Sequence, residues 1–212
     1  MSSKQTSTTI LLVRHGVTSS TGKVLPGRAK GLHLSETGIA QAETAATRIA
    51  DLSKQPTALY VSPLERTRET AAPIARALGL KAQIHRGLIE CDFGDWTGAQ
   101  LSALQKKPEW RTVQTAPSAF RFPNGESFTD MQRRIWDALC EIAERHRGET
   151  VVAVSHADPI KAAVTYAQGV PLDLFQRTVI STCSVSALML GTGSPVVLSV
   201  NNTSSLKDLQ PS

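Results

Sequence analysis

Short apolar runs alternate along the chain with longer segments in which apolar residues recur at helical spacing. Two of the runs, 10–13 and 151–154, contain four consecutive apolar residues each, which is typical of strands buried on both faces. The last two predicted strands flank the turn 191–193, which has the sequence Gly-Thr-Gly. The pattern predicts six strands, at residues 10–13, 59–61, 82–84, 151–154, 185–190 and 196–200.

Apolar positions three and four residues apart predict four helices, at residues 37–52, 64–78, 128–145 and 160–166. Gly79 ends the second helix, because glycine readily adopts the left-handed conformation that closes a helix. Ser127, followed three residues later by Asp130, resembles a capping box at the start of the third. Strands that alternate with helices predict an α/β fold, a three-layer sandwich with a mostly parallel central sheet flanked by helices.

The length of 212 residues is that of one domain, and the apolar fraction of 41% is enough to build its core. We therefore expect a single domain over residues 1–212, with loosely ordered ends at 1–8 and 203–212. The least regular part of the sequence is 97–126, which contains three prolines. This segment is predicted to be an insertion or a lid rather than a domain boundary.

The formal net charge of +5 fits a protein that binds either nucleic acid or small anions. Aromatic residues make up only 5% of the chain and the basic residues are scattered, which argues against a nucleic-acid surface. No apolar run approaches the roughly 18 residues that span a bilayer. The polar opening segment 1–9 lacks the apolar region of a signal peptide, and the three cysteines form no Cys-x-x-Cys pair. We expect a cytoplasmic protein that binds neither nucleic acid nor membrane, and we leave open whether it forms a homo-oligomer.

Imidazole and guanidinium side chains follow the apolar strands. His15, preceded by Arg14, comes directly after the first predicted strand, and His156 comes after the fourth. Arg66 lies shortly after the second strand. Because α/β sheets bind ligands at the carboxyl ends of their strands, these four side chains are expected at one edge of the sheet. Such a set suits a phosphoryl group, which needs multidentate cations and a nucleophile, although each histidine could instead be a hydrogen-bonded structural residue.

Six short motifs follow one another along the chain, at residues 12–18 (LVRHGVT), 34–42 (LSETGIAQA), 62–71 (SPLERTRETA), 90–98 (ECDFGDWTG), 123–127 (PNGES) and 154–156 (VSH). In this order the motifs resemble those of the histidine phosphatase superfamily, also called the phosphoglycerate mutase-like family. The resemblance covers about residues 10 to 205. It implies the α/β sandwich that the hydrophobic pattern predicts independently.

The resemblance also implies a role for each residue that matches a motif. His15 would be the nucleophile that forms a phosphohistidine, and Glu90 would donate a proton to the leaving oxygen. Arg14, Arg66 and His156 would bind and stabilise the transferring phosphoryl group. The residues that could contact the rest of the substrate are Gly16, Thr18, Thr21, Gly27 and Arg28.

The chain departs from the family pattern at two positions. The family often has asparagine six residues after the nucleophile, where this chain has Thr21. The late histidine is followed by Ala157 and Asp158, whereas the family commonly has glycine directly after it. A carboxylate two residues after this histidine resembles the acid phosphatase branch, which makes Asp158 an alternative proton donor. The other interpretation is that Asp158 caps a helix beginning near Pro159, and Arg28 could likewise be a solvated surface residue.

The activity that the resemblance implies is that of a histidine acid or broad-specificity phosphatase, which hydrolyses a small phosphomonoester through a phosphohistidine. No metal-ligand spacing such as His-Glu-x-x-His occurs, and two arginines would supply the positive charge, so we expect neither a metal nor a cofactor. The alternatives are a phosphoglycerate mutase with the same nucleophile and a non-catalytic module that binds a phosphorylated ligand. The short stretch between Glu90 and Pro123 favours the phosphatase, because mutases of the family are usually longer.

Overall fold

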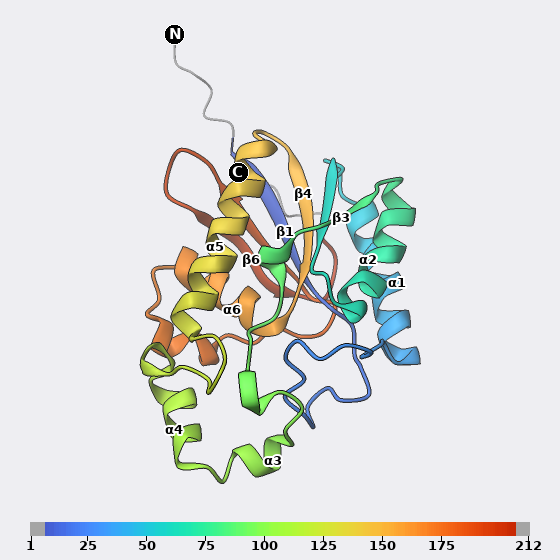
Figure 1. Cartoon of the computed structure of the whole chain (residues 1–212). Coiled ribbons are helices and arrows are strands. Elements are labelled where there is room, and N and C mark those ends of the chain that lie inside the picture. Colours follow the sequence, from blue (N-terminus) through green and yellow to red (C-terminus); the bar gives the residue numbers. More distant parts are fainter. Residues whose placement is uncertain (1–6, 207–212) are drawn as a thin grey trace.

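The computed structural model describes residues 7–206, in which a six-stranded sheet lies between two layers of helices (Figure 1). The strands are β1 (Thr8–Arg14), β2 (Ala58–Val61), β3 (Ala82–Ile84), β4 (Thr150–Ser155), β5 (Val185–Leu190) and β6 (Val196–Asn202). Their order in the sheet is β3-β2-β4-β1-β5-β6. β4 pairs in parallel with β1 and β2, and β2 with β3, whereas β5 runs antiparallel to both of its neighbours. The prediction of a mostly parallel sheet is confirmed.

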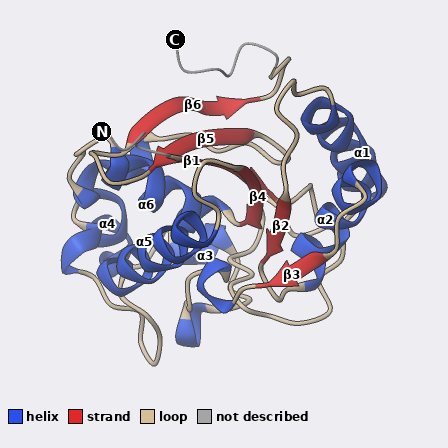
Figure 2. Cartoon of the chain, turned by 90° about the horizontal axis from the view of Figure 1, so that it is seen from above, coloured by secondary structure: helices blue, strands red, loops and turns tan. Residues whose placement is uncertain are grey.

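The helices cover both faces of the sheet, with α1 and α2 on one side and α5 and α6 on the other (Figure 2). The helices are α1 (Glu36–Ala50), α2 (Glu65–Leu78), α3 (Leu101–Leu104), α4 (Pro108–Thr115), α5 (Phe128–Arg145) and α6 (Ala157–Ala167). Successive residues of β1 enter different cores, since Ile10 and Leu12 belong to one apolar cluster and Leu11 and Val13 to the other. A strand buried on both faces must be apolar throughout, which explains the continuous run in the sequence.

The end of α2 and the start of α5 lie where the sequence predicts them. Gly79 lies in the left-handed region with φ of 65° and closes α2, as its position predicts. At the start of α5, the backbone N–H of Asp130 donates to Ser127 Oγ at 3.0 Å, so Ser127 is the N-cap. The Asp130 carboxylate pairs with Arg121. The cap fixes the point at which the chain enters the longest helix of the described residues.

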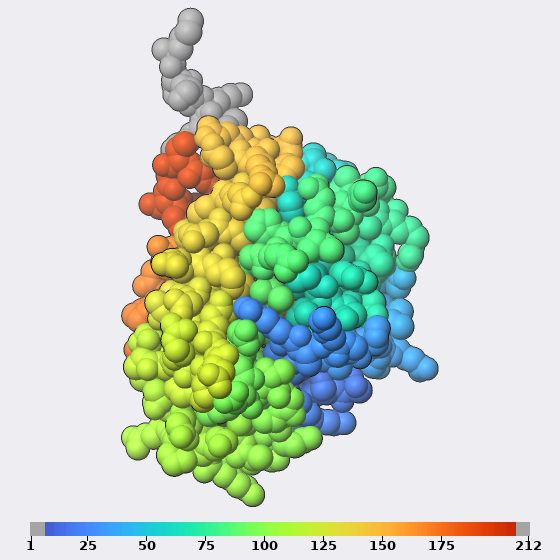
Figure 3. All heavy atoms as spheres, viewed as in Figure 1, coloured from blue at the N-terminus to red at the C-terminus, as the bar shows by residue number. Residues whose placement is uncertain are grey.

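The segment 97–126 contains α3, α4 and a 3₁₀ turn, so the irregular insertion predicted there has short helices of its own. It covers the end of the molecule at which the strands β1 and β4 finish, drawn in light green in Figure 3. The Trp96 ring lies 6.3 Å from that of Trp110, 5.4 Å from that of Phe120 and 5.5 Å from that of Phe122, measured between centroids. These aromatic rings therefore form the core that holds the insertion against the sheet.

Residues from both of the predicted loose ends lie in the folded part of the described chain. Thr8, assigned to a loose end, is buried in β1 and its hydroxyl donates to the Ala143 carbonyl at 2.8 Å. At the other end, Leu206 is buried in the core beside α1 and α2. The remaining part of that prediction, at 1–6 and 207–212, lies outside the described residues. Of the helices at 7–206, not one combines the length and the apolar character needed to cross a membrane.

Candidate active site

The turn after β1 presents His15 to a cavity. The Nδ1 atom of His15 lies 2.8 Å from the carbonyl oxygen of Gly16. A carbonyl can only accept a hydrogen bond, which assigns the imidazole proton to Nδ1 and leaves the lone pair on Nε2. Burial, with a further effect of the Arg66 charge, lowers the pKa of His15 to about 3. The imidazole is therefore neutral and nucleophilic at physiological pH.

Close backbone packing positions this turn against α1. A Cβ atom on Gly16 would lie 2.6 Å from the Gly38 carbonyl oxygen, and one on Gly38 would lie 2.1 Å from the Val17 carbonyl oxygen. Only glycine allows the two segments to approach so closely. The N–H of Gly16 donates to Thr70 Oγ1 at 3.0 Å. Gly16 is thus used for packing, and its N–H already has a partner in the protein.

His156 directly follows β4 and lies beside His15. The centroids of the His15 and His156 rings are 5.2 Å apart in an edge-to-face arrangement. His156 is fully buried, and its Nε2 atom lies 2.7 Å from Ser62 Oγ. Burial lowers its pKa well below the usual value for histidine. With Ser62 fixing one ring nitrogen, Nδ1 is the atom available to a ligand.

Two arginines lie beside His15, of which Arg14 lines the cavity and Arg66 is buried and is not among the lining residues. Arg66 is completely buried, donates from Nη2 to the Gly27 carbonyl at 2.8 Å and from Nε to His15 Nε2 at 3.3 Å. Arg14 donates from Nη1 to the Ile180 carbonyl at 2.6 Å. Each guanidinium thereby has a fixed orientation. The Arg66 contact also confirms that His15 Nε2 is an acceptor.

Three buried nitrogen atoms at this site have no hydrogen-bond partner, namely Arg14 Nε, Arg66 Nη1 and His156 Nδ1. Buried polar atoms in folded proteins almost always have partners, so a group of unpartnered nitrogens implies a ligand with several acceptor oxygens. The two guanidiniums carry positive charge, which further selects an anion. A phosphoryl group satisfies both requirements.

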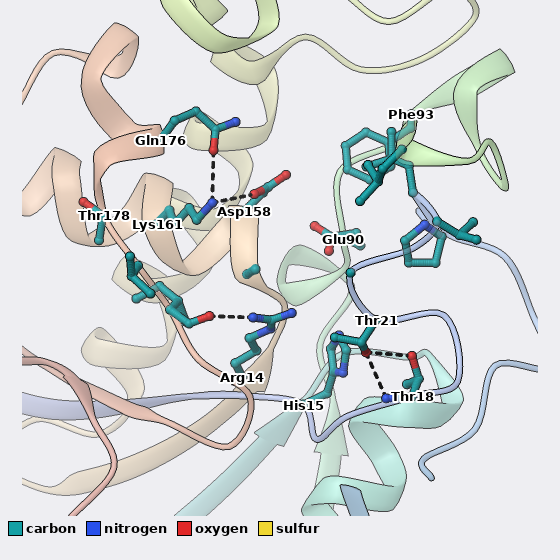
Figure 4. Close-up of a pocket in the computed structure, with 18 residues that line it drawn as sticks. Arg14, His15, Thr18, Thr21, Glu90, Phe93, Asp158, Lys161, Gln176 and Thr178 are labelled. Carbon is teal, nitrogen blue, oxygen red and sulfur yellow. Dashed lines mark hydrogen bonds and ion pairs between the residues drawn. The ribbon is translucent and has the colours of Figure 1, made fainter. Parts of the chain in front are cut away.

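Glu90 faces the same cavity (Figure 4). Burial and the nearby charge of Asp158 raise the pKa of Glu90 to about 7, although Arg66 acts in the opposite direction. Its Oε1 accepts a hydrogen bond from the N–H of Cys91 at 2.9 Å, and its Oε2 lies 3.9 Å from His156 Nδ1. Glu90 can therefore carry a proton near neutral pH and release it during a reaction.

Arg28 holds the segment of Glu90 in place and does not face the cavity. Its Nε donates to the Glu90 carbonyl at 2.9 Å, and its two terminal nitrogens pair with Asp92 and Glu126 at 3.2 and 3.1 Å. Glu126 also pairs with Arg134, which donates to the carbonyl of Glu90 at 3.4 Å. The expectation that Arg28 contacts substrate is not supported by this geometry. Sequence reasoning also overlooked Glu126 as a structural link, although the motif 123–127 contains it.

The predicted helix-capping role of Asp158 is wrong. α6 begins at Ala157, before the expected position near Pro159, and its N-cap is His156. Asp158 lies in the first helical turn, where its Oδ1 is 3.5 Å from Lys161 Nζ and its side chain lines the cavity. As a pocket carboxylate close enough to raise the pKa of Glu90, Asp158 remains the alternative proton donor.

The cavity above these residues has a volume of about 370 Å³, within the usual range for small-molecule sites. Thr18 and Thr21 line it, as expected, and their hydroxyl oxygens lie 3.0 Å apart. Gly27 is not among the lining residues. The other residues that line the cavity were not predicted as site residues: Gly22, Val24, Leu25, Pro26, Phe93, Leu101, Ala157, Lys161, Gln176, Thr178, Val179 and Ile180. Within residues 7–206, no group of three or more His, Cys, Asp or Glu side chains is placed so that it could hold a metal ion.

A family model of the histidine phosphatase superfamily (branch 1) matches residues 10–203. The chain therefore belongs to the histidine phosphatase superfamily, as its motifs and its fold indicate.

Known relatives of the chain include both phosphatases and mutases. Phosphoserine phosphatase 1 of Hydrogenobacter thermophilus is 34% identical over 199 residues, which make up 92% of each protein. The 2,3-bisphosphoglycerate-dependent phosphoglycerate mutase of Mesorhizobium japonicum is 28% identical over 207 residues, or 94% of this chain and 96% of the mutase. Mycobacterial relatives are 34% identical over 201 residues, and the chain spans only 55% of their length.

The fold also matches a solved structure. Bacillus stearothermophilus YhfR superimposes on the chain with a TM-score of 0.85 and 27% sequence identity. The superposition covers 93% of this chain and 98% of the other.

Proposed function

We propose that the protein is a phosphomonoester hydrolase that transfers the phosphoryl group of a small metabolite to His15 and then to water. The observation that carries the proposal is the group of three unpartnered buried nitrogens, on Arg14, Arg66 and His156, around the imidazole of His15. They would donate to the phosphoryl oxygens, on which negative charge accumulates in the transition state. The similarity to Phosphoserine phosphatase 1 supports hydrolysis of a phosphomonoester.

In the first step of this mechanism, the Nε2 lone pair of His15 attacks phosphorus while the ester P–O bond breaks. The protonated carboxyl of Glu90 gives its proton to the leaving oxygen, so that a neutral alcohol departs. The hydrogen bond from His15 Nδ1 to the Gly16 carbonyl favours the positive charge that forms on the ring. The product is a phosphohistidine.

In the second step, a water molecule attacks phosphorus and the P–N bond to His15 breaks. The Glu90 carboxylate left by the first step takes a proton from this water, which restores the carboxyl and yields inorganic phosphate. A pKa of about 7 suits Glu90 to both steps, because either protonation state is accessible near neutral pH.

A phosphoglycerate mutase is the second candidate, because the Mesorhizobium japonicum mutase is similar over 94% of the chain. A mutase would share the phosphohistidine but return the phosphoryl group to bound substrate. The volume of the cavity, about 370 Å³, is consistent with a small metabolite in either case rather than nucleic acid. All three cysteines, one of them exposed, are free thiols, which supports a reducing compartment such as the cytoplasm.

Rapid quenching with radiolabelled p-nitrophenyl phosphate tests the proposal. The wild-type protein should yield an acid-labile, base-stable phosphoprotein and release free phosphate, whereas His15→Ala should do neither. His33→Ala is the matched control, since His33 is an exposed residue that pairs with Glu69. Labelling that persists in His15→Ala would refute the role of His15. Phosphate transfer to phosphoglycerates without release would favour the mutase.

A further inference from the structure

One wall of the cavity carries a row of polar side chains from α6 and from the 3₁₀ segment η4 (Leu172–Arg177). Lys161 Nζ lies 3.5 Å from Asp158 Oδ1 and donates to Gln176 Oε1 at 3.0 Å (Figure 4). The Asp158 and Lys161 side chains are mostly buried, with exposed fractions of 18% and 17%. An ammonium has three N–H groups and a carboxylate two oxygens, so these contacts leave donors and acceptors that a ligand can use.

The opposite side of the cavity is mostly apolar, apart from the hydroxyls of Thr18 and Thr21. Phe93 lies across the cavity from Lys161 and Gln176, with Glu90 between them (Figure 4). The other apolar side chains that line the cavity near the loop after His15 are Val24, Leu25 and Pro26. A ligand beyond the phosphate therefore meets an apolar surface on one side and a row of hydrogen-bonding groups on the other.

We propose that the leaving group of the substrate is an uncharged alcohol with several hydroxyls, such as a sugar or another polyol. Such a molecule has C–H groups for the Phe93 side and hydroxyls, each both donor and acceptor, for Asp158, Lys161 and Gln176. This inference rests on the proposed phosphatase activity, and it assigns these three residues to substrate specificity.

The charges of Asp158 and Lys161 disfavour leaving groups that are themselves charged. The Asp158 carboxylate offsets the Lys161 ammonium, so the row as a whole is close to electrically neutral. A second carboxylate or phosphate on the substrate would face Asp158, and it could bind Lys161 only by separating a mostly buried ion pair. A leaving group with a positive charge would be repelled by the Lys161 ammonium. Specificity by such repulsion is common in selective sites.

The test compares kcat/KM for glucose 6-phosphate, 3-phosphoglycerate and phosphoserine in the wild-type protein and in Asp158→Asn. Wild type should prefer glucose 6-phosphate to both others by about tenfold or more, since one disfavoured buried charge costs at least that much. Asp158→Asn leaves Lys161 unopposed, so the ratio of glucose 6-phosphate to 3-phosphoglycerate should fall by about tenfold or more. Because both are alkyl esters, their ratio cancels any effect of Asp158 on the acidity of Glu90.

Lys161→Met removes the positive charge and leaves Asp158 unopposed. It should therefore make 3-phosphoglycerate a still poorer substrate relative to glucose 6-phosphate. Asp130→Asn is the matched control, because Asp130 also lies in the first turn of a helix and pairs with an arginine, but outside this cavity. It should leave the ratio unchanged.

A wild-type preference for 3-phosphoglycerate or phosphoserine, with phosphate release that depends on His15, would overturn this inference and leave the proposed phosphatase activity intact. The inference would also be overturned if Asp158→Asn left unchanged the ratio of kcat/KM for glucose 6-phosphate to that for 3-phosphoglycerate. Failure to release phosphate from any ester, p-nitrophenyl phosphate included, would instead refute the phosphatase activity itself.

Discussion

At the residue scale, burial sets the protonation of the two side chains to which the proposed chemistry assigns the main steps. Desolvation disfavours the charged form of any group, and for His15 that form is the imidazolium, so its pKa falls to about 3. For Glu90 the charged form is the carboxylate, so the same effect raises the pKa to about 7. One buried pocket thus places a neutral imidazole beside a carboxyl group that is about half protonated near pH 7.

A prediction for Glu90 follows from the direction of its shift. As the pH rises through about 7, Glu90 loses the proton that the leaving oxygen needs, so kcat/KM for an alkyl phosphomonoester should fall. Turnover of p-nitrophenyl phosphate should fall much less, because p-nitrophenolate leaves without a proton. Glu90→Gln should abolish this pH dependence and slow the alkyl ester by roughly 10² to 10⁴. The measurement is kcat/KM for both esters from about pH 5 to 9.

Persistence of the same pH dependence in Glu90→Gln would show that another group is the acid. Asp158, which lines the cavity, is then the residue to test. A selective slowing of the alkyl ester in Asp158→Asn, with both esters turned over normally by Glu90→Gln, would assign the proton to Asp158.

At the scale of elements, the start of α5 is linked to the segment that carries Glu90. Glu126, just before the N-cap of α5, pairs with Arg28 at 3.1 Å and with Arg134 at 2.8 Å. Both arginines donate to the backbone carbonyl of Glu90. The side chain of Glu90 can keep its place only if this backbone is held, because the Glu90 segment belongs to no strand or long helix.

Glu126→Gln tests this link. Loss of the carboxylate charge weakens both arginine contacts, so kcat/KM for an alkyl ester should fall by about tenfold or more as Glu90 shifts from its position. The kcat/KM for p-nitrophenyl phosphate should be largely retained, because transfer of its phosphoryl group to His15 does not need the acid. Asp130→Asn removes a nearby exposed carboxylate and should leave both rates unchanged. Equal losses with both esters would indicate a general structural defect instead.

At the scale of the whole molecule, the sheet brings together side chains that are far apart in the sequence. β1 and β4 are adjacent and parallel, so His15 and His156, which follow their carboxyl ends, meet at one edge. α2 brings Arg66 to the same place. Two arginines then concentrate positive charge where a phosphoryl group would bind.

This concentration of charge predicts that the proposed phosphatase reaction needs no metal ion. Arg14 and Arg66 would supply the electrostatic stabilisation that a divalent cation provides in other phosphatases, so EDTA should leave kcat/KM unchanged. Arg66→Ala should lower kcat by about 10² or more, since it removes a donor to the transition state. Both are measured by phosphate release. Loss of activity in EDTA that a divalent ion restores would contradict the prediction.

Much of the architecture was determined by the sequence alone, because helices and strands follow from local apolar periodicity and from capping residues. The ranges expected for β3, for β5 and for α5 coincide with those of the structure. The roles proposed for His15 and Glu90 also come from the sequence, since each residue lies in a recognisable local motif, and these roles stay predictions.

The tertiary structure decided the contacts between distant segments, which no local sequence pattern can predict. Arg28 stands in a loop expected to touch substrate, yet carboxylates at 92 and 126 draw its guanidinium away from the cavity. One interpretation of Asp158 was a cap for a helix beginning near Pro159, yet α6 begins two residues earlier, at Ala157, and Asp158 lies close to Lys161 and lines the cavity. Gln176 joins the same wall only because η4 packs against α6. Packing at long range, rather than residue type, therefore determined which polar side chains face a substrate.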